Sequence, residues 1–369
     1  MSIFIIKPVG LACDLRCTYC FYEGIKDEPC ATRERMDEET VQAVIKEITA
    51  HSGKVAEFNW LGGEPLLAGL DFYEHVVALQ QQHKQPGQVV INKVQTNGSH
   101  LDDAWATFFA GHRFNVGVSV EGPAHLHDRF RHTANGQSVH ARIEQGIQSL
   151  RRAGVHFGTI CVVNSYNVSN PDELFSYFLG LGVKNFSFND AKGLSETDGQ
   201  PLVTTVQPDA FARFMCRIFD LWAERDDPTI IIRQIRTVMQ ALLGGKFQLC
   251  TFSNRCHDFY DINIEGDVYP CEDYTRDTRF CYGNIRNGLD AIKNSAQHEQ
   301  FTLLTEELRR DCQTCPWWNI CHGGCIRDYY IYHNQAVHRN AMCDAHKTFF
   351  RHVATYLGRH VALPAVYRQ

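Results

Sequence analysis

The chain has 369 residues, of which 44% are hydrophobic and 21% are charged, a composition typical of a globular enzyme. Its net charge is −6 and its 36 Lys and Arg residues are scattered, which argues against nucleic acid or an anionic membrane surface as the main partner. No stretch is apolar enough to span a bilayer and the first residues do not resemble a secretory signal, so we expect a cytoplasmic protein.

The first half of the chain alternates strand-like and helix-like stretches. Strands are predicted at 3–9, 57–61, 89–96, 114–120, 156–164 and 185–189, where β-branched and aromatic residues cluster. Helices are predicted at 37–53, 101–112 and 140–154. Six β–α units in series indicate an α/β fold with a parallel sheet, a partial (β/α)6 version of the TIM-like barrel. Its functional site should lie at the C-terminal ends of the strands.

The second half changes character twice. Residues 193–208 are rich in turn formers and indicate a loop or linker, and helical patterns follow at 208–227 and 232–245. From Cys250 onward, turn signals, short strands and cysteines dominate. We therefore predict three parts: a barrel at 1–200, linker helices at 201–249 and a cysteine-rich domain at 250–369.

Cysteine is unusually frequent, with 15 residues in the chain. Thiols stay reduced in the cytoplasm, so ligation of a metal or cluster is favoured over disulfide formation. The first group, Cys13, Cys17 and Cys20, forms a C-x3-C-x2-C run directly after the first strand. Three thiols can hold a [4Fe–4S] cluster with one open iron, or a zinc ion that takes its fourth ligand from elsewhere.

This run, followed by the aromatic Phe21, resembles the radical SAM superfamily. The resemblance implies that S-adenosylmethionine completes the cluster through its amino and carboxylate groups, and that its reductive cleavage starts hydrogen abstraction from carbon. The same resemblance implies cofactor contacts for the GGEP motif after strand two, with Glu64 accepting from the methionyl ammonium, and for polar residues at the following strand ends. These residues are Gly62, Gly63, Glu64, Pro65, Gln95, Asn97, Ser119 and Arg131. Two alternatives are an ordinary turn at Asn97 and a solvated helix charge at Arg131.

The C-terminal cysteines provide eight thiols, enough for two four-cysteine sites that either zinc or iron–sulfur clusters could occupy. Their spacing resembles the SPASM domain, which implies two auxiliary [4Fe–4S] clusters and therefore three clusters in all. By position, the first auxiliary set is Cys250, Cys256, Cys271 and Cys325. The second auxiliary set is Cys312, Cys315, Cys321 and Cys343.

Two carboxylates, Glu272 and Asp273, directly follow Cys271 and are candidates for a catalytic base. A structural hydrogen bond or a solvated charge is the alternative for either residue. Several stretches, among them IKPVGLACDLRCTYCFY and VGVSVEGPAHLHDRFR, resemble anaerobic sulfatase-maturating enzymes. That resemblance implies oxidation of a Cys or Ser side chain to formylglycine, with an Asp after the third SPASM cysteine as base. Here Glu272 takes that position, one methylene longer.

Two further segments depart from that family, FSFNDAKG at 186–193 and GGCIRDYY at 323–330. Related SPASM enzymes cross-link the side chains of ribosomal peptides through carbon–carbon or thioether bonds. Our hypothesis is a radical SAM/SPASM enzyme that abstracts a side-chain hydrogen, from the β-carbon, in a peptide or protein. Formylglycine formation is the first expectation and peptide cross-linking the alternative. A small-molecule alcohol dehydrogenase and a non-catalytic metal-binding protein are less favoured. The expected reducing partner is a flavodoxin or ferredoxin.

Overall fold

The computed structural model describes residues 2–20, 22, 35–193, 202–245, 249–275, 277–329 and 339–367. Phe21, Cys30 and half of the predicted linker at 193–208 lie outside these residues. The chain forms two compact units, each built from several stretches of sequence. Unit 1 comprises Met1–Ser119, Arg131–Phe157 and Cys256–Leu303, and unit 2 comprises Val120–Phe130, Gly158–Arg255 and Leu304–Gln369. The predicted domain bounds stay a prediction, since the units follow contacts rather than chain order.

Unit 1 contains a mixed sheet whose strands run in the order β10-β9-β8-β1-β2-β3-β4. The strands are β1 (Ile3–Ile6), β2 (Val55–Trp60), β3 (Val89–Thr96), β4 (Asn115–Ser119), β8 (Phe259–Ile262), β9 (Asp267–Tyr269) and β10 (Gly283–Asn284). Neighbours from β8 through β4 are parallel, and β9 is antiparallel to both β8 and β10. The parallel part brings the loops after β1, β2 and β3 to one edge of the sheet.

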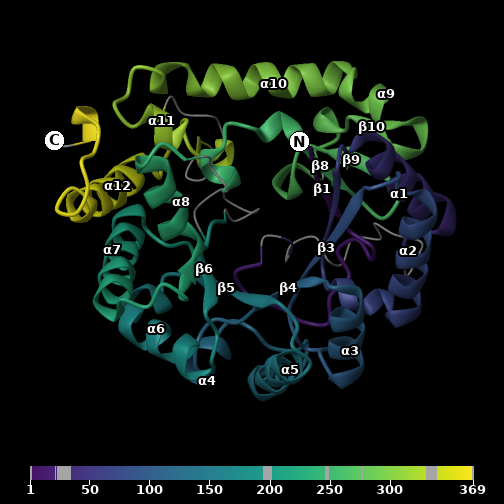
Figure 1. Cartoon of the computed structure of the whole chain (residues 1–369), viewed down its shortest axis with the longest axis horizontal. Coiled ribbons are helices and arrows are strands. Elements are labelled where there is room, and N and C mark those ends of the chain that lie inside the picture. The colour runs from purple at the N-terminus through teal and green to yellow at the C-terminus, as the bar shows by residue number, and fades with distance from the viewer. Residues whose placement is uncertain are drawn as a thin grey trace. The chain divides into compact units, whose positions relative to one another are not determined.

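The helices of unit 1 cover one side of these strands (Figure 1). They are α1 (Glu38–His51), α2 (Leu70–His83), α3 (Asp103–His112), α5 (His140–Arg152) and α9 (Leu289–Lys293), and α10 (Ala296–Arg309) begins in this unit. Asp37 caps α1 and Asp102 caps α3 through their carboxylates, as their sequence positions require. Trp60 and Tyr73 meet edge to face in the core between β2 and α2.

Unit 2 holds almost all of β5 (Phe157–Val163), with β6 (Asn185–Asp190) and β7 (Ile231–Ile232), which pair in parallel. Its helices are α4 (Ala124–His127), α6 (Pro171–Gly180), α7 (Pro208–Arg225), α8 (Arg233–Leu242), α11 (Trp318–Cys321) and α12 (Cys343–Leu357). Phe178, Phe186 and Phe188 pack together between α6 and β6. Short 3-10 helices also carry the cysteine-bearing segments. In unit 2 these are η4 (Cys250–Phe252), η9 (Arg310–Cys312) and η10 (Ile326–Tyr329), and in unit 1 they are η5 (Cys256–Asp258) and η6 (Glu272–Tyr274).

All six predicted strands of the first half are present, and β3 agrees to the residue. The five predicted helices correspond to α1, α3, α5, α7 and α8. The prediction missed α2 and α6, and it also missed α10 and α12, two long helices within the region expected to consist of turns and short strands. Among the residues that the structure describes, no helix has both the length and the hydropathy that crossing a membrane requires.

Candidate active site

The three-cysteine loop follows β1 and is fixed to unit 1 by its backbone. Cys17 is buried, whereas Cys13 and Cys20 are half-buried. The Cys20 amide donates to the Cys17 carbonyl at 2.9 Å, which closes a turn between these two thiols. The amide of Arg16 donates to the His132 carbonyl at 2.8 Å. The predicted ligands are therefore presented on one anchored loop.

The glycines of GGEP allow its backbone to approach this loop closely. The amide of Gly63 donates to the Gly10 carbonyl at 3.0 Å, and that of Glu64 donates to the Ala12 carbonyl at 2.7 Å. A Cβ on Gly63 would lie 1.9 Å from the Ala12 carbonyl oxygen, so no larger residue fits there. Gly62 also has a φ of 124°, which an L-residue rarely adopts. The motif thus supports the cysteine loop directly.

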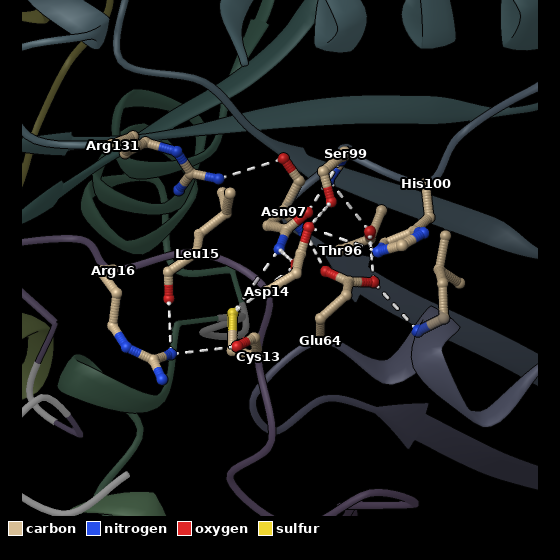
Figure 2. A network of polar contacts seen from close by, with 12 residues as sticks. Cys13, Asp14, Leu15, Arg16, Glu64, Thr96, Asn97, Ser99, His100 and Arg131 are labelled. Carbon is tan, nitrogen blue, oxygen red and sulfur yellow. Dashed lines mark hydrogen bonds and ion pairs between the residues drawn. The ribbon is translucent and has the colours of Figure 1, made fainter. Parts of the chain in front are cut away.

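Glu64 joins GGEP to the end of β3 and is fully buried (Figure 2). Its Oε1 accepts from the Leu66 amide at 2.9 Å and from Thr96 Oγ1 at 2.7 Å, and its Oε2 accepts from the Asn97 amide at 2.6 Å. Burial raises the pKa of Glu64 to about 7, although these hydrogen bonds oppose the rise. This carboxylate has a structural role, and its expected contact with a methionyl ammonium stays a prediction. The next residue of the motif, Pro65, is buried and begins the 3-10 helix η2 (Pro65–Ala68).

Asp14, inside the cysteine run, was missed by the sequence analysis, yet it connects the loop to the end of β3. Figure 2 shows Asn97, Ser99 and His100 pointing toward its carboxylate. Asn97 Nδ2 donates to Asp14 Oδ1 at 2.7 Å and Ser99 Oγ donates to Oδ2 at 2.6 Å, while His100 Nε2 lies 3.3 Å from Oδ2. Burial would raise the pKa of Asp14, but the hydrogen bonds outweigh burial and hold that pKa below its ordinary value. Asn97 Nδ2 also lies 3.6 Å from Cys13 Sγ.

The other predicted strand-end residues meet in the same part of unit 1. Gln95 Nε2 donates to Ser119 Oγ at 2.9 Å. Arg131 is buried, and its guanidinium donates to the Asn97 carbonyl at 3.0 Å and to the Tyr19 hydroxyl at 3.1 Å. The alternative interpretation of Arg131 as a solvated helix charge is therefore wrong. Asn97 does form the expected turn, since its Oδ1 accepts from the Ser99 amide at 2.8 Å.

Glu272 and Asp273 lie in η6, after Cys271, and differ in their surroundings. Glu272 is half-buried and its Oε2 accepts from the Tyr22 hydroxyl at 3.1 Å, whereas Asp273 is exposed. Burial raises the pKa of Glu272, with the charge of Lys7 opposing the rise. A carboxylate with a raised pKa is a better proton acceptor near neutral pH.

A buried ion pair supports this region, and the sequence analysis did not single it out. Lys7, at the end of β1, has no exposed surface and donates to Asp261 Oδ2 at 2.6 Å and to Thr275 Oγ1 at 2.7 Å. Thr275 Oγ1 in turn lies 3.2 Å from the Glu272 carbonyl. The ammonium of Lys7 also lies 5.2 Å from the centroid of the Tyr22 ring. In the sequence, the signal for a buried ion pair was the lysine that follows four apolar residues in IFIIK.

The second auxiliary set gathers around one cavity of unit 2, with a volume of about 300 Å³. Its lining includes Cys312, Cys315, Cys321 and Cys343, together with Trp317 and Trp318. Within the described ranges, no group of three or more His, Cys, Asp or Glu side chains has the spacing of a single-ion site. Thiols that line a cavity, rather than converging on the position of a single ion, suit a polynuclear cluster.

The first auxiliary set is divided between the units, with Cys256 and Cys271 in unit 1 and Cys250 and Cys325 in unit 2. In unit 1, the buried hydroxyl of Tyr282 has no hydrogen-bond partner among the described residues. The Tyr282 amide donates to the Val268 carbonyl at 2.8 Å, in the hairpin that leads to Cys271. Burial raises the pKa of Tyr282, and the charges of Cys271 and Cys256 add to the rise. A group held by these thiols would provide the acceptor that this hydroxyl lacks.

The two segments that depart from the family contact each other within unit 2. Lys192, after β6, forms ion pairs with Asp190 at 2.8 Å and with the fully buried Asp328. The guanidinium of Arg327 donates to the Lys192 carbonyl at 2.6 Å. These contacts hold the backbone next to Cys325. Two carboxylates share one ammonium here, so the group depends on the lysine charge.

Comparison with known proteins supports the assignment of these sites. Residues 8–178 match the model of the radical SAM superfamily, and residues 250–316 match SPASM, an iron–sulfur cluster-binding domain. The serine-type anaerobic sulfatase-maturating enzyme of Klebsiella pneumoniae is 30% identical over 94% of this chain and 86% of its own length. The cysteine-type enzyme of Clostridium perfringens is 29% identical over 94% of this chain and 95% of its own.

Solved structures agree with these relatives. Native anSMEcpe with bound AdoMet superposes with a TM-score of 0.86 at 26% identity, covering 96% of this chain and 98% of that one. The same protein with bound AdoMet and the Cp18Cys peptide gives a TM-score of 0.87 at 28% identity, covering 96% and 97%. SuiB of Streptococcus suis shares the fold, with a TM-score of 0.65 at 16% identity.

The fold and these sites define a radical SAM enzyme with a SPASM iron–sulfur domain, which confirms the predicted fold class and the use of S-adenosylmethionine and iron–sulfur clusters. Within that class, the chain belongs to the family of anaerobic sulfatase-maturating enzymes. These comparisons confirm that the chain is an enzyme rather than a non-catalytic metal-binding protein.

Proposed function

We propose that this enzyme oxidises a Cys or Ser side chain of a peptide or protein to formylglycine. Relatives of both the serine type and the cysteine type match nearly the whole chain, and one related structure holds a peptide. The observation that carries the chemistry is the half-buried carboxylate of Glu272, next to a predicted cluster ligand and oriented by Tyr22. That arrangement suits removal of a proton from a substrate that is also losing an electron.

The residues present fit three [4Fe–4S] clusters and S-adenosylmethionine. Cys13, Cys17 and Cys20 would hold the first cluster, and the two auxiliary sets would hold the others. GGEP and the ends of β3 and β4 would form the cofactor site, because GGEP and Asn97 contact the cysteine loop and Gln95 bonds to Ser119 at the end of β4. When bound, these groups supply one-electron removal of hydrogen from the substrate β-carbon and an acceptor for the electron that leaves.

The chain's own residues would then handle the proton. Formation of a carbon–heteroatom double bond requires the substrate thiol or hydroxyl to lose a proton and the substrate to lose one electron, in addition to the hydrogen atom taken from carbon. For a Ser substrate this gives the aldehyde directly. For a Cys substrate it gives a thioaldehyde, which water would hydrolyse to the aldehyde with release of hydrogen sulfide. Glu272 would accept that proton, because burial raises its pKa and Tyr22 fixes one oxygen at 3.1 Å. Lys7 and Asp261 would stabilise the region, as Thr275 links them to the Glu272 backbone. Asp273, which is exposed, is less suited to act as this base.

The supply of electrons and the location complete the proposal. A flavodoxin or ferredoxin would reduce the first cluster, since each cleavage of the cofactor consumes one electron. A cytoplasmic location would keep the fifteen cysteines of the chain reduced and available as ligands.

The test is an anaerobic assay of the reconstituted enzyme with dithionite, S-adenosylmethionine and peptides that carry a sulfatase motif with Cys, Ser or Ala at the target position. We expect 5′-deoxyadenosine and, for Cys or Ser only, the mass of an aldehyde that reacts with hydrazide reagents. A product that has lost two hydrogens and does not react with hydrazide would indicate a cross-link. Turnover of a free alcohol without any peptide would refute a peptide substrate.

Variants of the two carboxylates separate their roles. Glu272→Gln should retain 5′-deoxyadenosine formation while the aldehyde product falls at least about tenfold, the lower range for loss of a general base. Asp273→Asn is the matched control, one residue away and exposed, and should stay close to wild type. Loss of product in the control alone would transfer the role of base to Asp273.

A further inference from the structure

We propose that the hydroxyl of Tyr329 donates a hydrogen bond to the sulfur of Cys312 when this cysteine ligates the second auxiliary cluster, and that this bond raises the reduction potential of the cluster. The inference rests on the proposed ligand set of that cluster, and it assigns a potential-setting role to a residue outside the set.

The geometry within unit 2 places the hydroxyl between two acceptors. Tyr329 ends η10 and has no exposed surface. Its hydroxyl oxygen lies 3.5 Å from Cys312 Sγ and donates to the Gly323 carbonyl oxygen at 3.2 Å. A phenol has one proton to donate, so the two acceptors compete for it.

Ligation of iron decides this competition. A protonated thiol can itself donate to the phenol oxygen, which leaves the phenol proton for Gly323. A ligating cysteine is a thiolate, which has no proton and carries negative charge, so it becomes the stronger acceptor. The proton of Tyr329 therefore turns from the carbonyl to the sulfur when the cluster is present.

The carbonyl of Gly323 loses little when this happens. It also accepts from Asn340 Nδ2 at 3.0 Å, and Asn340 is itself held because its Nδ2 donates to the Cys325 carbonyl at 2.9 Å. No buried acceptor is left unsatisfied by the change, and an unsatisfied acceptor would otherwise cost about 1–3 kcal/mol.

The hydroxyl also remains a donor near neutral pH, because a phenol keeps its proton there. A hydrogen bond to a cluster sulfur stabilises the reduced form, which carries one more negative charge, and therefore raises the potential.

The experiment is an EPR-monitored redox titration of the fully reconstituted chain, with iron analysis alongside. Tyr329→Phe should retain its iron and shift the midpoint potential of one auxiliary cluster to a more negative value. Tyr367→Phe is the matched control. The ring centroid of Tyr367 lies 5.3 Å from that of Trp317, which lines the same cavity, but the Tyr367 hydroxyl bonds to Asn319. All potentials of the control should equal those of wild type.

A second variant protects the test against misfolding. Replacing Tyr329 with 3-fluorotyrosine keeps the ring in place but makes the phenol a stronger donor, so the same potential should move to a more positive value. Unchanged potentials in the fluorotyrosine variant, or equal shifts in Tyr329→Phe and Tyr367→Phe, would overturn the proposal. These readouts need no peptide substrate, so they stay separate from failure of the formylglycine assay.

Discussion

Replacing Gly63 with Ala should disable the three-cysteine loop without touching a cysteine. The new Cβ would lie 1.9 Å from the Ala12 carbonyl oxygen, whereas real contacts of this kind are not shorter than 3.0 Å. The loop backbone must therefore retreat by at least 1.1 Å, the difference between these distances. That movement breaks or strains the bonds to the carbonyls of Gly10 and Ala12, each worth about 1–3 kcal/mol when its buried partner is left unpaired.

Iron analysis and 5′-deoxyadenosine formation measure the outcome. Wild type should hold about twelve iron atoms in three clusters, and Gly63→Ala should hold about eight, with the auxiliary clusters retained and 5′-deoxyadenosine absent. Gly111→Ala is the matched control, because a Cβ at this site in α3 would meet nothing within 4 Å. Full iron loading and wild-type cleavage in Gly63→Ala would refute the idea that this close backbone contact fixes the loop.

Four further predictions follow from the site. Replacing Cys13, Cys17 and Cys20 together with Ala should abolish 5′-deoxyadenosine formation, and iron analysis should find about two thirds of the wild-type iron. Unchanged cleavage of the cofactor would contradict the assignment of these ligands. Because burial raises the pKa of Glu272, product formation should fall as pH drops through a value above the ordinary carboxylate range, and Glu272→Gln should remove that limb of the pH profile. Burial raises the pKa of Glu64 from 4.5 in the unfolded chain to about 7 in the folded protein. The protonated side chain therefore contributes its full stability below pH 4.5, and about 3 kcal/mol of that stability is lost as pH rises through 7. Amide exchange of the GGEP segment should show this loss in wild type and not in Glu64→Gln. Lys192→Met leaves Asp190 and the buried Asp328 without their cation and should cost about 3–5 kcal/mol in urea unfolding, and adding Asp328→Asn should recover part of that loss.

The strands of the first half could be predicted because burial on their two faces leaves a pattern in the sequence. In β2, half-buried and buried residues alternate along all six positions, which is the periodicity that identifies a strand. The helices α10 and α12 were missed for a different reason. Cysteines and turn formers surround these helices in the sequence, and such local signals predict turns and short strands more strongly than the periodicity predicts helices.

The candidate site shows the same division between local and distant information. The cysteine run and GGEP are contiguous motifs, so the sequence identifies them. The partners of Asp14 lie 83 to 86 positions away, and Lys7 meets Asp261 across 254 positions. No spacing in one sequence indicates such contacts, because the fold alone brings these residues together. The roles assigned to Glu272 and to the strand-end residues stay predictions for the same reason.

The pairing of β1 has a consequence for how the enzyme is made. β1 lies between β2 and β8 and pairs in parallel with both, although β8 begins at Phe259. While the ribosome is still making the middle of the chain, β1 is therefore an edge strand, and Lys7 has no counter-ion until Asp261 emerges. The loop that receives the first iron–sulfur cluster starts from this strand. That strand accordingly gains its second neighbour, and Lys7 its counter-ion, only when more than two thirds of the chain has been synthesised.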